Sequence, residues 1–536
     1  MKRYALKLLS LLLVLATLSL MVSCDLSSML EDIAPDDLGN GVENGSGGIN
    51  MPSATNHFFE TATTKVDNTF IGYTPPEDLD FEGKVINILS LEKTTNKREW
   101  YKDEAEDDID IAIALRNQNA QDTLNVSLNF EFIPYKSVNH SDYSLKLFDT
   151  VMNDVNADLH EYDISANLSS FTSSINIRDY AADLNDAVNF PYFNFELPCW
   201  NQSIIKNTTV NDHLLYIAGD ITPSMFDEAC VVWYNKDRYD MFKEPSDPAC
   251  MQELAIEGSW TYEELYRWSS SFYMDSNGKA GKQIDDSYGL IMTPGESAPL
   301  PAAAFQYAWD LEFISTNPDG THSFSIAGNQ KIEQALEDCR NIFIGNGTYT
   351  SARADTFAQG QALFYMGKLF SDYDSSMKIR EMEDLYGLLP MPKYDVEQER
   401  YTTSTLDDFS LIFVLDHSGS TVVTKEAVSA FLQYACELNY TNVRANYFDS
   451  IVKPKFFGTN DPDGTVTKSI AIFNTVVDNI NFDMCNIYSM QLNNINRIWT
   501  YACSPTSYQT MEQLFNAHLS EFEDALVEVD QWHGLS

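Results

Sequence analysis

The stretch Ala-Cys-Val-Val-Trp-Tyr-Asn-Lys-Asp-Arg-Tyr, residues 229 to 239, decides how the chain is organised. Its β-branched and aromatic residues predict a buried strand, and the polar Asn-Lys-Asp step predicts a turn or helix after it. Upstream, Leu214–Asp220 predicts another strand, ending in a Gly-Asp turn. Downstream, Trp260–Leu265 predicts a helix start and Asp275–Lys279 a turn. We therefore expect the chain to pass here from one half of the protein to the other.

The residues before this stretch predict strands and helices in alternation. The strands are Lys84–Ser90, Val126–Ile133 and Tyr162–Ala166; the helices are Asp108–Gln121 and a segment with Leu145, Phe148, Met152 and Val155 on one stripe. This order predicts a parallel sheet with right-handed crossovers. Because ligands bind outside the carboxyl ends of such strands, we expect Leu91–Trp100 and Asn167–Phe171 at the edge of a binding site.

The helix that starts near Trp260 has a predicted structural role. Thr261 and Glu264 have the spacing of a capping box, and Trp260 and Leu265 have the spacing of a hydrophobic staple. We therefore expect Trp260 and Trp268 to pack in the core.

Several motifs in this order resemble family 1 extracellular solute-binding proteins, the maltose-binding-protein-like receptors of bacterial ABC importers. They are "YNKD", "WTYEEL" and "DSNGK", then "F-x-x-G-x-A" with its strand at Phe357–Gly367, and "G-x-x-P-x-P" within Tyr386–Pro392. The resemblance runs from about Lys84 to near Val529 and depends on the order of the motifs. It implies an α/β, two-lobed periplasmic-binding-protein-like fold (type II). Each lobe would be a mixed or parallel sheet flanked by helices, and hinge crossings would join the lobes.

The N-terminus predicts secretion. A positive segment with Lys2, Arg3 and Lys7 precedes the apolar run Leu8–Met21, which has the length of a secretory signal. Met-Val-Ser-Cys resembles a bacterial lipobox, which implies a diacylglycerol anchor on Cys24. The alternative is cleavage at a small-residue site with Cys24 incidental.

The sequence and the resemblance together predict the following boundaries: signal peptide 1–23, flexible tether 24–80, N-terminal lobe 81–231 plus 400–440, and C-terminal lobe 232–399 plus 441–536. The tether is rich in Gly, Asn, Ser and Asp and cannot bury apolar surface.

Composition excludes some partners. The net charge of −45, from 34 Lys and Arg against 79 Asp and Glu, argues against binding to nucleic acid or to an anionic membrane surface. Beyond Cys24, seven cysteines at irregular spacing form neither a disulfide framework nor a zinc pattern, so we expect most of them to be small core residues, and a single disulfide is the alternative. The dispersed His residues lack metal-ligand spacing. We expect no metal and no cofactor.

Catalytic motifs are absent from the sequence: it contains no HExxH, GxSxG, P-loop or GxGxxG pattern. We therefore expect a protein that is not an enzyme. Paired carboxylates such as Asp407 and Asp408 leave open a secreted glycoside hydrolase, and a surface adhesin is a further alternative.

The resemblance implies a lipid-anchored receptor on the extracellular face of the bacterial cytoplasmic membrane. It would capture a sugar or oligosaccharide by hinge closure, act as a monomer and deliver the ligand to ABC permease subunits. A peptide or amino acid is the alternative ligand.

Sugars stack on aromatic rings and need fixed polar partners. Near the expected site, the aromatic candidates are Trp100, Trp200, Trp233, Trp309, Tyr365 and Trp499, and the polar candidates are Ser169, Asp220, Asp407 and Asp408. For each residue, ordinary core or surface packing is the alternative. Trp309 and Tyr365 are favoured, and we expect alanine at either position to weaken binding by about 2 kcal/mol or more with little change in melting temperature.

Overall fold

The computed structural model describes residues 79–100, 105, 107–135, 140–173, 180–295, 298–299, 301–352, 354–369, 379–406, 408–449, 464–532 and 534–535. The expected signal segment, Cys24 and most of the tether lie outside these ranges, as does Asp407. Among the residues in these ranges, no helix has both the length and the apolar character needed to cross a membrane.

The first sheet has four strands in the order β14-β3-β1-β2. They are β1 (Lys84–Leu91), β2 (Val126–Ile133), β3 (Ile164–Leu168) and β14 (Ser410–Val414). Strand β1 is parallel to both β2 and β3, which confirms the predicted parallel arrangement. Strand β14 comes from much later in the chain and adds to β3 in the antiparallel direction.

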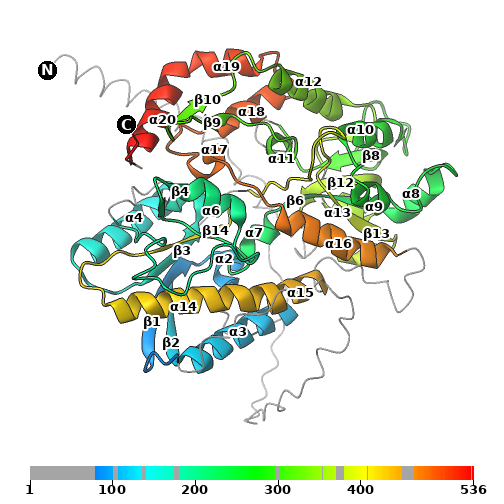
Figure 1. Cartoon of the computed structure of the whole chain (residues 1–536). Coiled ribbons are helices and arrows are strands. Elements are labelled where there is room, and N and C mark those ends of the chain that lie inside the picture. The colour runs from blue at the N-terminus through cyan, green and yellow to red at the C-terminus, as the bar shows by residue number, and fades with distance from the viewer. Residues whose placement is uncertain are drawn as a thin grey trace, which may run out of the picture. The chain divides into compact units, whose positions relative to one another are not determined.

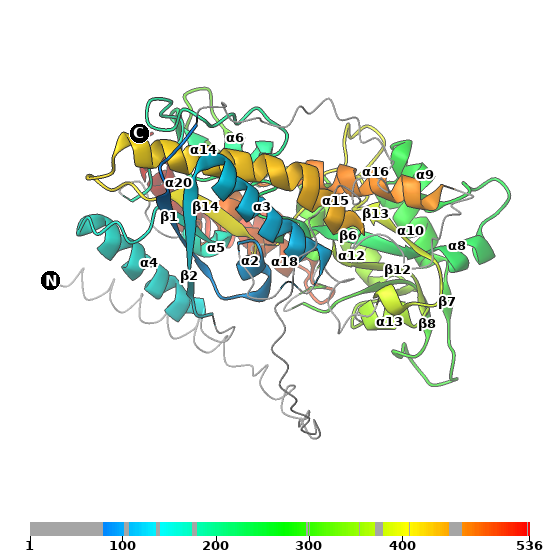
Figure 2. The same ribbon diagram turned by 90° about the horizontal axis from the view of Figure 1, so that it is seen from below.

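Helices cover this sheet. They are α2 (Thr94–Arg98), α3 (Asp108–Leu124), α4 (His140–Asn156), α5 (Ser169–Thr172), α6 (Gln202–Thr208), α7 (Ser224–Asp227), α14 (Val422–Leu438), the π-helical turn η5 (Asn439–Val443) and α15 (Arg444–Tyr447). Helix α14 lies alongside α3 in both views (Figures 1 and 2). In α4 the buried side carries Tyr143, Leu147 and Val151. Leu145 is 61% exposed, so the predicted apolar stripe was partly wrong.

The second sheet has the order β11-β8-β12-β6-β13, with β7 paired to β8. The strands are β6 (Cys230–Asn235), β7 (Tyr273–Met274), β8 (Ser287–Met292), β11 (Thr348–Tyr349), β12 (Ala362–Lys368) and β13 (Tyr386–Pro390). Every residue of β6 is buried. The strand ends at Asn235, whose side-chain oxygen accepts the Arg238 amide at 2.9 Å and caps the next helix. The predicted strand and the helix after it are confirmed.

The remaining elements surround the second sheet or follow it. They are α8 (Lys236–Phe242), α9 (Met251–Ile256), α10 (Tyr262–Ser270), α11 (Ala302–Ala308), α12 (Gln330–Ile344), α13 (Ala354–Ala358), η4 (Ile379–Glu381), α16 (Thr465–Asp478), α17 (Met484–Ile487), α18 (Asn496–Cys503), α19 (Met511–Ala517) and α20 (Leu519–Trp532), with the short pair β9 (Ile314–Thr316) and β10 (His322–Phe324). We call the first sheet with its helices lobe 1, and the second sheet with its helices lobe 2.

Two local predictions were wrong. The segment predicted as a strand at Leu214–Asp220 contributes only the end of β5 (His213–Leu214), which pairs with β4 (Thr209–Val210). Further along this segment, Ile217 pairs with Ile412 and Gly219 pairs with Trp200. Because these two partners belong to different parts of the chain, the segment forms no continuous ladder.

The predicted capping box at α10 is also absent. Thr261 makes no side-chain cap, and Glu264, the other half of the predicted box, pairs with Arg267 at 2.7 Å instead. Trp260 is fully buried and its indole N–H donates to the Pro390 carbonyl at 2.9 Å. Its predicted structural role is confirmed.

Three chain segments pass between the lobes side by side. Ala229 pairs with Thr405 in a single antiparallel bridge, and Thr403 pairs with Ile480 in a parallel one. The segment 403–406 is therefore the central crossing. It is held on one side by the Cys230 amide, which donates to the Ser404 carbonyl at 2.8 Å.

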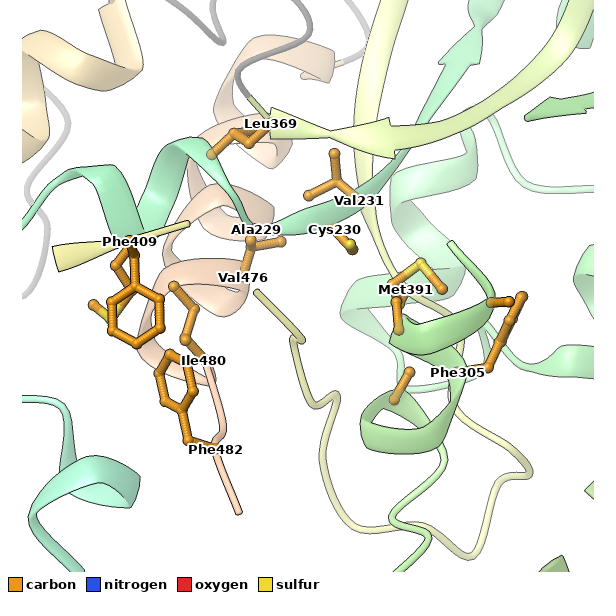
Figure 3. Close-up of a cluster of buried hydrophobic side chains, with 14 of the residues drawn as sticks. Ala229, Cys230, Val231, Phe305, Leu369, Met391, Phe409, Val476, Ile480 and Phe482 are labelled. Atoms are coloured by element: carbon orange, nitrogen blue, oxygen red, sulfur yellow. The ribbon is translucent and has the colours of Figure 1, made fainter. Parts of the chain in front are cut away.

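Apolar side chains from these crossings pack against one another (Figure 3). The rings of Phe409 and Phe482 lie 4.7 Å apart, and Ala229, Cys230 and Ile480 belong to the same buried cluster. The crossings thus have few backbone hydrogen bonds between them and a continuous apolar lining.

Candidate functional site at the junction of the lobes

Helix α17 contacts one helix from each lobe. In lobe 1, α5 follows β3 directly, and in lobe 2, α11 follows β8. Helix α17 packs on α5, and its N-cap residue Asp483 accepts the Tyr307 hydroxyl of α11 at 3.2 Å. Since α/β proteins bind ligands outside the carboxyl ends of their strands, we define this region as the junction site.

The lobe 1 side of the junction site is aromatic and polar. The Tyr135 and Tyr143 rings lie 5.6 Å apart, and Tyr143 and Phe171 lie 5.3 Å apart. They follow or cover the ends of β2 and β3. Nearby, the Gln491 amide donates to the Ser173 carbonyl, which joins the segment after α17 to the end of α5.

The lobe 2 side contributes a largely buried carboxyl group. Asp483 accepts the Asn486 amide at 2.9 Å as well as the Tyr307 hydroxyl. Burial is the main influence and raises the pKa of Asp483 to about 6, although these hydrogen bonds act in the opposite direction. Asp483 thus couples α17 to lobe 2 through a carboxyl group that ionises near neutral pH.

Three buried amide atoms around α17 and α11 have no hydrogen-bond partner in the part of the chain that the structure describes. They are Nε2 of Gln306, Oδ1 of Asn486 and Oε1 of Gln491. A buried polar group without a partner costs about 1–3 kcal/mol. A ligand that offers hydroxyl groups, which both donate and accept, would remove this cost.

Charged pairs flank the same junction. Lys93, just after β1, lies 2.8 Å from Asp408, just before β14. Lys368, the last residue of β12, pairs with Glu228 at the first crossing. Burial opposes the charge on Lys368, but the carboxylates of Glu228 and Asp408 outweigh it and raise the pKa of this lysine. Each positive charge therefore has a carboxylate partner.

The structure brings four of the predicted site residues near this junction. Ser169 begins α5, and its amide donates to the Phe409 carbonyl at 2.9 Å, next to Asp408. Trp233 and Tyr365 face each other on β6 and β12. The Trp233 indole N–H lies 3.4 Å from the Lys368 carbonyl, but both Trp233 and Tyr365 are fully buried.

Asp220 lies in a buried ion pair in lobe 1. The guanidinium of Arg444 contacts both of its carboxylate oxygens, at 2.8 and 2.9 Å. Arg444 also binds Asp478 at 2.5 Å. This arrangement gives Asp220 a structural role, and a ligand contact for it stays a prediction.

The other predicted tryptophans are buried in the lobes. Trp309 packs among Phe305, Tyr262 and Tyr394, with its ring 4.6 Å from that of Phe305. Trp100 lies beneath the Arg116 guanidinium. Trp200 donates to Gln433, and Trp499 to the Ala302 carbonyl. Ligand contacts by these residues stay predictions. The burial of Trp309 and Tyr365 argues against the expectation that alanine there would leave the melting temperature unchanged.

Sequence reasoning missed several residues of the junction site. They are Ser173, Glu228, Tyr307, Lys368, Asp483, Asn486 and Gln491, whereas Lys93 lies within the expected edge Leu91–Trp100. Lys368 is the last residue of the strand that contains Tyr365. Its position near the site could therefore have been predicted from the "F-x-x-G-x-A" motif and its strand. Gln491 gave no signal, because its contact with Ser173 joins residues 318 positions apart. No group of three or more His, Cys, Asp and Glu side chains within the described ranges is arranged to hold a metal ion.

Comparison with known proteins identifies the fold. No protein-family model matches the sequence, and no curated protein matches it. Among solved structures, the sugar-binding protein MalE from Xanthomonas citri matches with a TM-score of 0.53 and 12% identity, over 84% of this chain and 98% of that one. The cyclic α-maltosyl-1,6-maltose binding protein from Arthrobacter globiformis matches with a TM-score of 0.52 and 12% identity, over 83% of this chain and 100% of that one. The chain thus has the two-lobed α/β fold of MalE-like solute-binding proteins.

Proposed function

We propose that this chain is a solute-binding receptor that captures a carbohydrate at the junction site and closes its two lobes around it. The observation that carries the proposal is the contact of α17 with α5 in lobe 1 and α11 in lobe 2, where Gln306, Asn486 and Gln491 each have a buried amide atom without a hydrogen-bond partner among the described residues. The two sugar-binding structural neighbours support the same reading.

Closure follows from the way the lobes are joined. The crossings at Ala229, Thr403 and Ile480 pair through single-residue bridges, so small changes in backbone dihedrals there can rotate one lobe against the other. A ligand that contacts both lobes makes its full set of contacts only in the closed form. It therefore shifts the population toward that form.

The chemistry of the junction favours an uncharged polyhydroxylated ligand. The partly exposed Tyr135 ring offers a face on which the C–H side of a sugar ring can stack, and the buried Tyr143 ring packs against it. Amide groups suit hydroxyls, because each amide presents both a donor and an acceptor. Lys93 and Lys368 are already neutralised by carboxylates, which disfavours an anionic ligand.

The wider assignment rests on the N-terminal sequence and the fold. We place the receptor outside the cytoplasmic membrane, anchored through a diacylglycerol on Cys24, with the Gly- and Asn-rich segment after it as a tether. Its partners would be the permease subunits of an ABC importer, to which it delivers the sugar as a monomer. We assign no catalytic step.

Calorimetry with a panel of oligosaccharides, polyols and peptides tests the function. We expect an oligosaccharide to bind, and Gln491→Ala to weaken binding about 10-fold or more, since it removes a polar group worth about 1–3 kcal/mol. Gln334→Ala, which changes an exposed glutamine on α12, is the matched control and should bind normally. Binding of peptides alone would reject the sugar assignment, and binding of no solute by the folded protein would reject the receptor.

A further inference from the structure

The described cysteines include two thiol pairs. All seven cysteines in the described part are buried. The Cys436 thiol donates to the Cys199 carbonyl, and Cys339 interacts with Cys503 where α12 and α18 pack together. Sequence spacing gave no sign of these pairs, because the fold brings their partners together from distant parts of the chain.

The pair in lobe 1 joins α14 to the loop before α6. The Cys436 thiol lies 3.1 Å from the Cys199 carbonyl, across 237 positions of sequence. One turn earlier on α14, the side-chain oxygen of Gln433 accepts the Trp200 indole N–H at 3.0 Å and the Asn194 amide at 2.9 Å. These bonds fix the loop against the helix on both sides of Cys199.

The pair in lobe 2 joins α12 to the end of α18. The guanidinium of Arg340, next to Cys339, donates to the Ala502 carbonyl at 2.9 and 2.7 Å and to the Gln509 carbonyl at 2.7 Å. Ala502 is the neighbour of Cys503. The two thiols are therefore held together by hydrogen bonds on the adjacent residues.

The other three thiols have different surroundings. Cys230 lies near Lys368 and Glu228, Cys250 is hydrogen-bonded to Lys468, and Cys485 lies near Asp483. They provide an internal comparison for the two pairs.

We propose that the exported protein carries two disulfide bonds, Cys199–Cys436 in lobe 1 and Cys339–Cys503 in lobe 2. The extracellular setting comes from the proposed function, since disulfides persist in oxidising compartments. The pairing itself comes from the positions of the four thiols and stands without that function.

Each bond forms by thiol–disulfide exchange with a disulfide-containing oxidant. One thiolate attacks the oxidant's disulfide to give a mixed disulfide; the second thiolate then attacks the protein sulfur of that intermediate and forms the bond. The two protein thiols lose two protons and two electrons, and the oxidant becomes a dithiol. Burial raises the pKa of Cys339 and of Cys436 well above the usual range, so few thiolates exist in the folded state and the bonds form while the chain folds.

Both bonds leave the hinge free. Cys199 and Cys436 belong to lobe 1, and Cys339 and Cys503 to lobe 2, so neither bond ties one lobe to the other. Cross-linking within each lobe stabilises it mainly by restricting the unfolded chain. Rotation at the crossings would remain possible.

Peptide mapping of the full chain tests the pairs in two arms. In the first arm, purified chain is reduced, unfolded and refolded in a mixture of oxidised and reduced glutathione. In the second, the chain is recovered from cells after export. In both, free thiols are alkylated under denaturing conditions. We expect linked peptides for the two pairs, and alkylated Cys230, Cys250 and Cys485. Before alkylation, the intact chain should be lighter than the fully reduced chain by about 2 Da per bond, since each bond releases two hydrogens.

Variants sharpen the first arm. Cys199→Ser should lose only the lobe 1 cross-link and Cys339→Ser only the lobe 2 cross-link, whereas the matched control Cys485→Ser should keep both. Free or randomly paired cysteines after refolding would overturn the pairing. Correct bonds after refolding but free thiols in the exported chain would overturn the claim that the exported protein carries them. Sugar binding measured separately decides the proposed function, so the two failures are distinguishable.

Discussion

Replacing Glu99 with Gln should remove a large pH dependence of stability. Glu99 is 1% exposed and lies between α2 and α7. One carboxyl oxygen accepts the Ser224 amide at 2.8 Å, and the other has no hydrogen-bond partner among the described residues. Burial raises the pKa of Glu99 to about 8, and the hydrogen bond from Ser224 reduces the effect.

The sign and the size follow from proton linkage. The ordinary value for this carboxyl is 4.5, so the folded state holds the proton more tightly than the unfolded state. The stability contributed by Glu99 is fully present below pH 4.5 and is lost as the pH rises through 8. Each pKa unit of difference corresponds to about 1.4 kcal/mol, so between pH 5 and pH 9 the loss amounts to about 4 kcal/mol. Gln has nearly the shape of the protonated carboxyl and does not ionise.

Urea unfolding at pH 5, 7 and 9 measures this difference. The free energy of unfolding of Glu99→Gln relative to the wild type should rise steadily with pH, by about 4 kcal/mol over this range. Glu257→Gln, which changes an exposed glutamate, is the matched control and should follow the wild type. Equal pH dependence in the wild type and Glu99→Gln would refute the reasoning.

Three further substitutions test separate parts of the account. Asp220→Ala should lower the free energy of unfolding by about 3–5 kcal/mol, because it leaves Arg444 buried without its main partner; wild-type urea unfolding would contradict this. Trp309→Ala should lower it by about 3–5 kcal/mol through the cavity it creates, whereas Tyr508→Ala, at a side chain 93% exposed, should change it by less than about 0.5 kcal/mol. Cys24→Ala should move the protein from the membrane to the soluble fraction and remove the mass of the lipid, and unchanged partition would contradict the anchor.

Local sequence pattern predicted much of the fold. The apolar run of β6 and the alternation in β2 were sufficient to predict both strands, because strand pattern depends on nearby residues. The parallel order of the first sheet followed from alternating strands and helices. The segment before Asp220 failed as a strand because its pairing partners, Trp200 and Ile412, lie on different parts of the fold. Thr261 and Glu264 failed as a capping box because Glu264 pairs with Arg267 and the Thr261 side chain makes no cap hydrogen bond.

The site was harder to predict from sequence. A tryptophan ring can either stack on a sugar or pack in the core, and the sequence does not separate these two roles. Trp309 and Trp100 are fully buried. Ser169 and Asp408 flank strand ends, which local pattern reveals, and their contact with a ligand stays a prediction. Gln491 became visible only when the fold brought it to Ser173. Contacts between distant segments leave no local signal.

Small-angle X-ray scattering with and without ligand tests the central claim, closure of the lobes around a bound sugar, most directly. The protein is titrated with the oligosaccharide that calorimetry identifies, and scattering is recorded at saturation. We expect the radius of gyration to fall on binding, with a smaller fall for Gln491→Ala at a sugar concentration that saturates the wild type but not the variant. An unchanged radius of gyration in the wild type, at a saturation confirmed by calorimetry, would contradict closure.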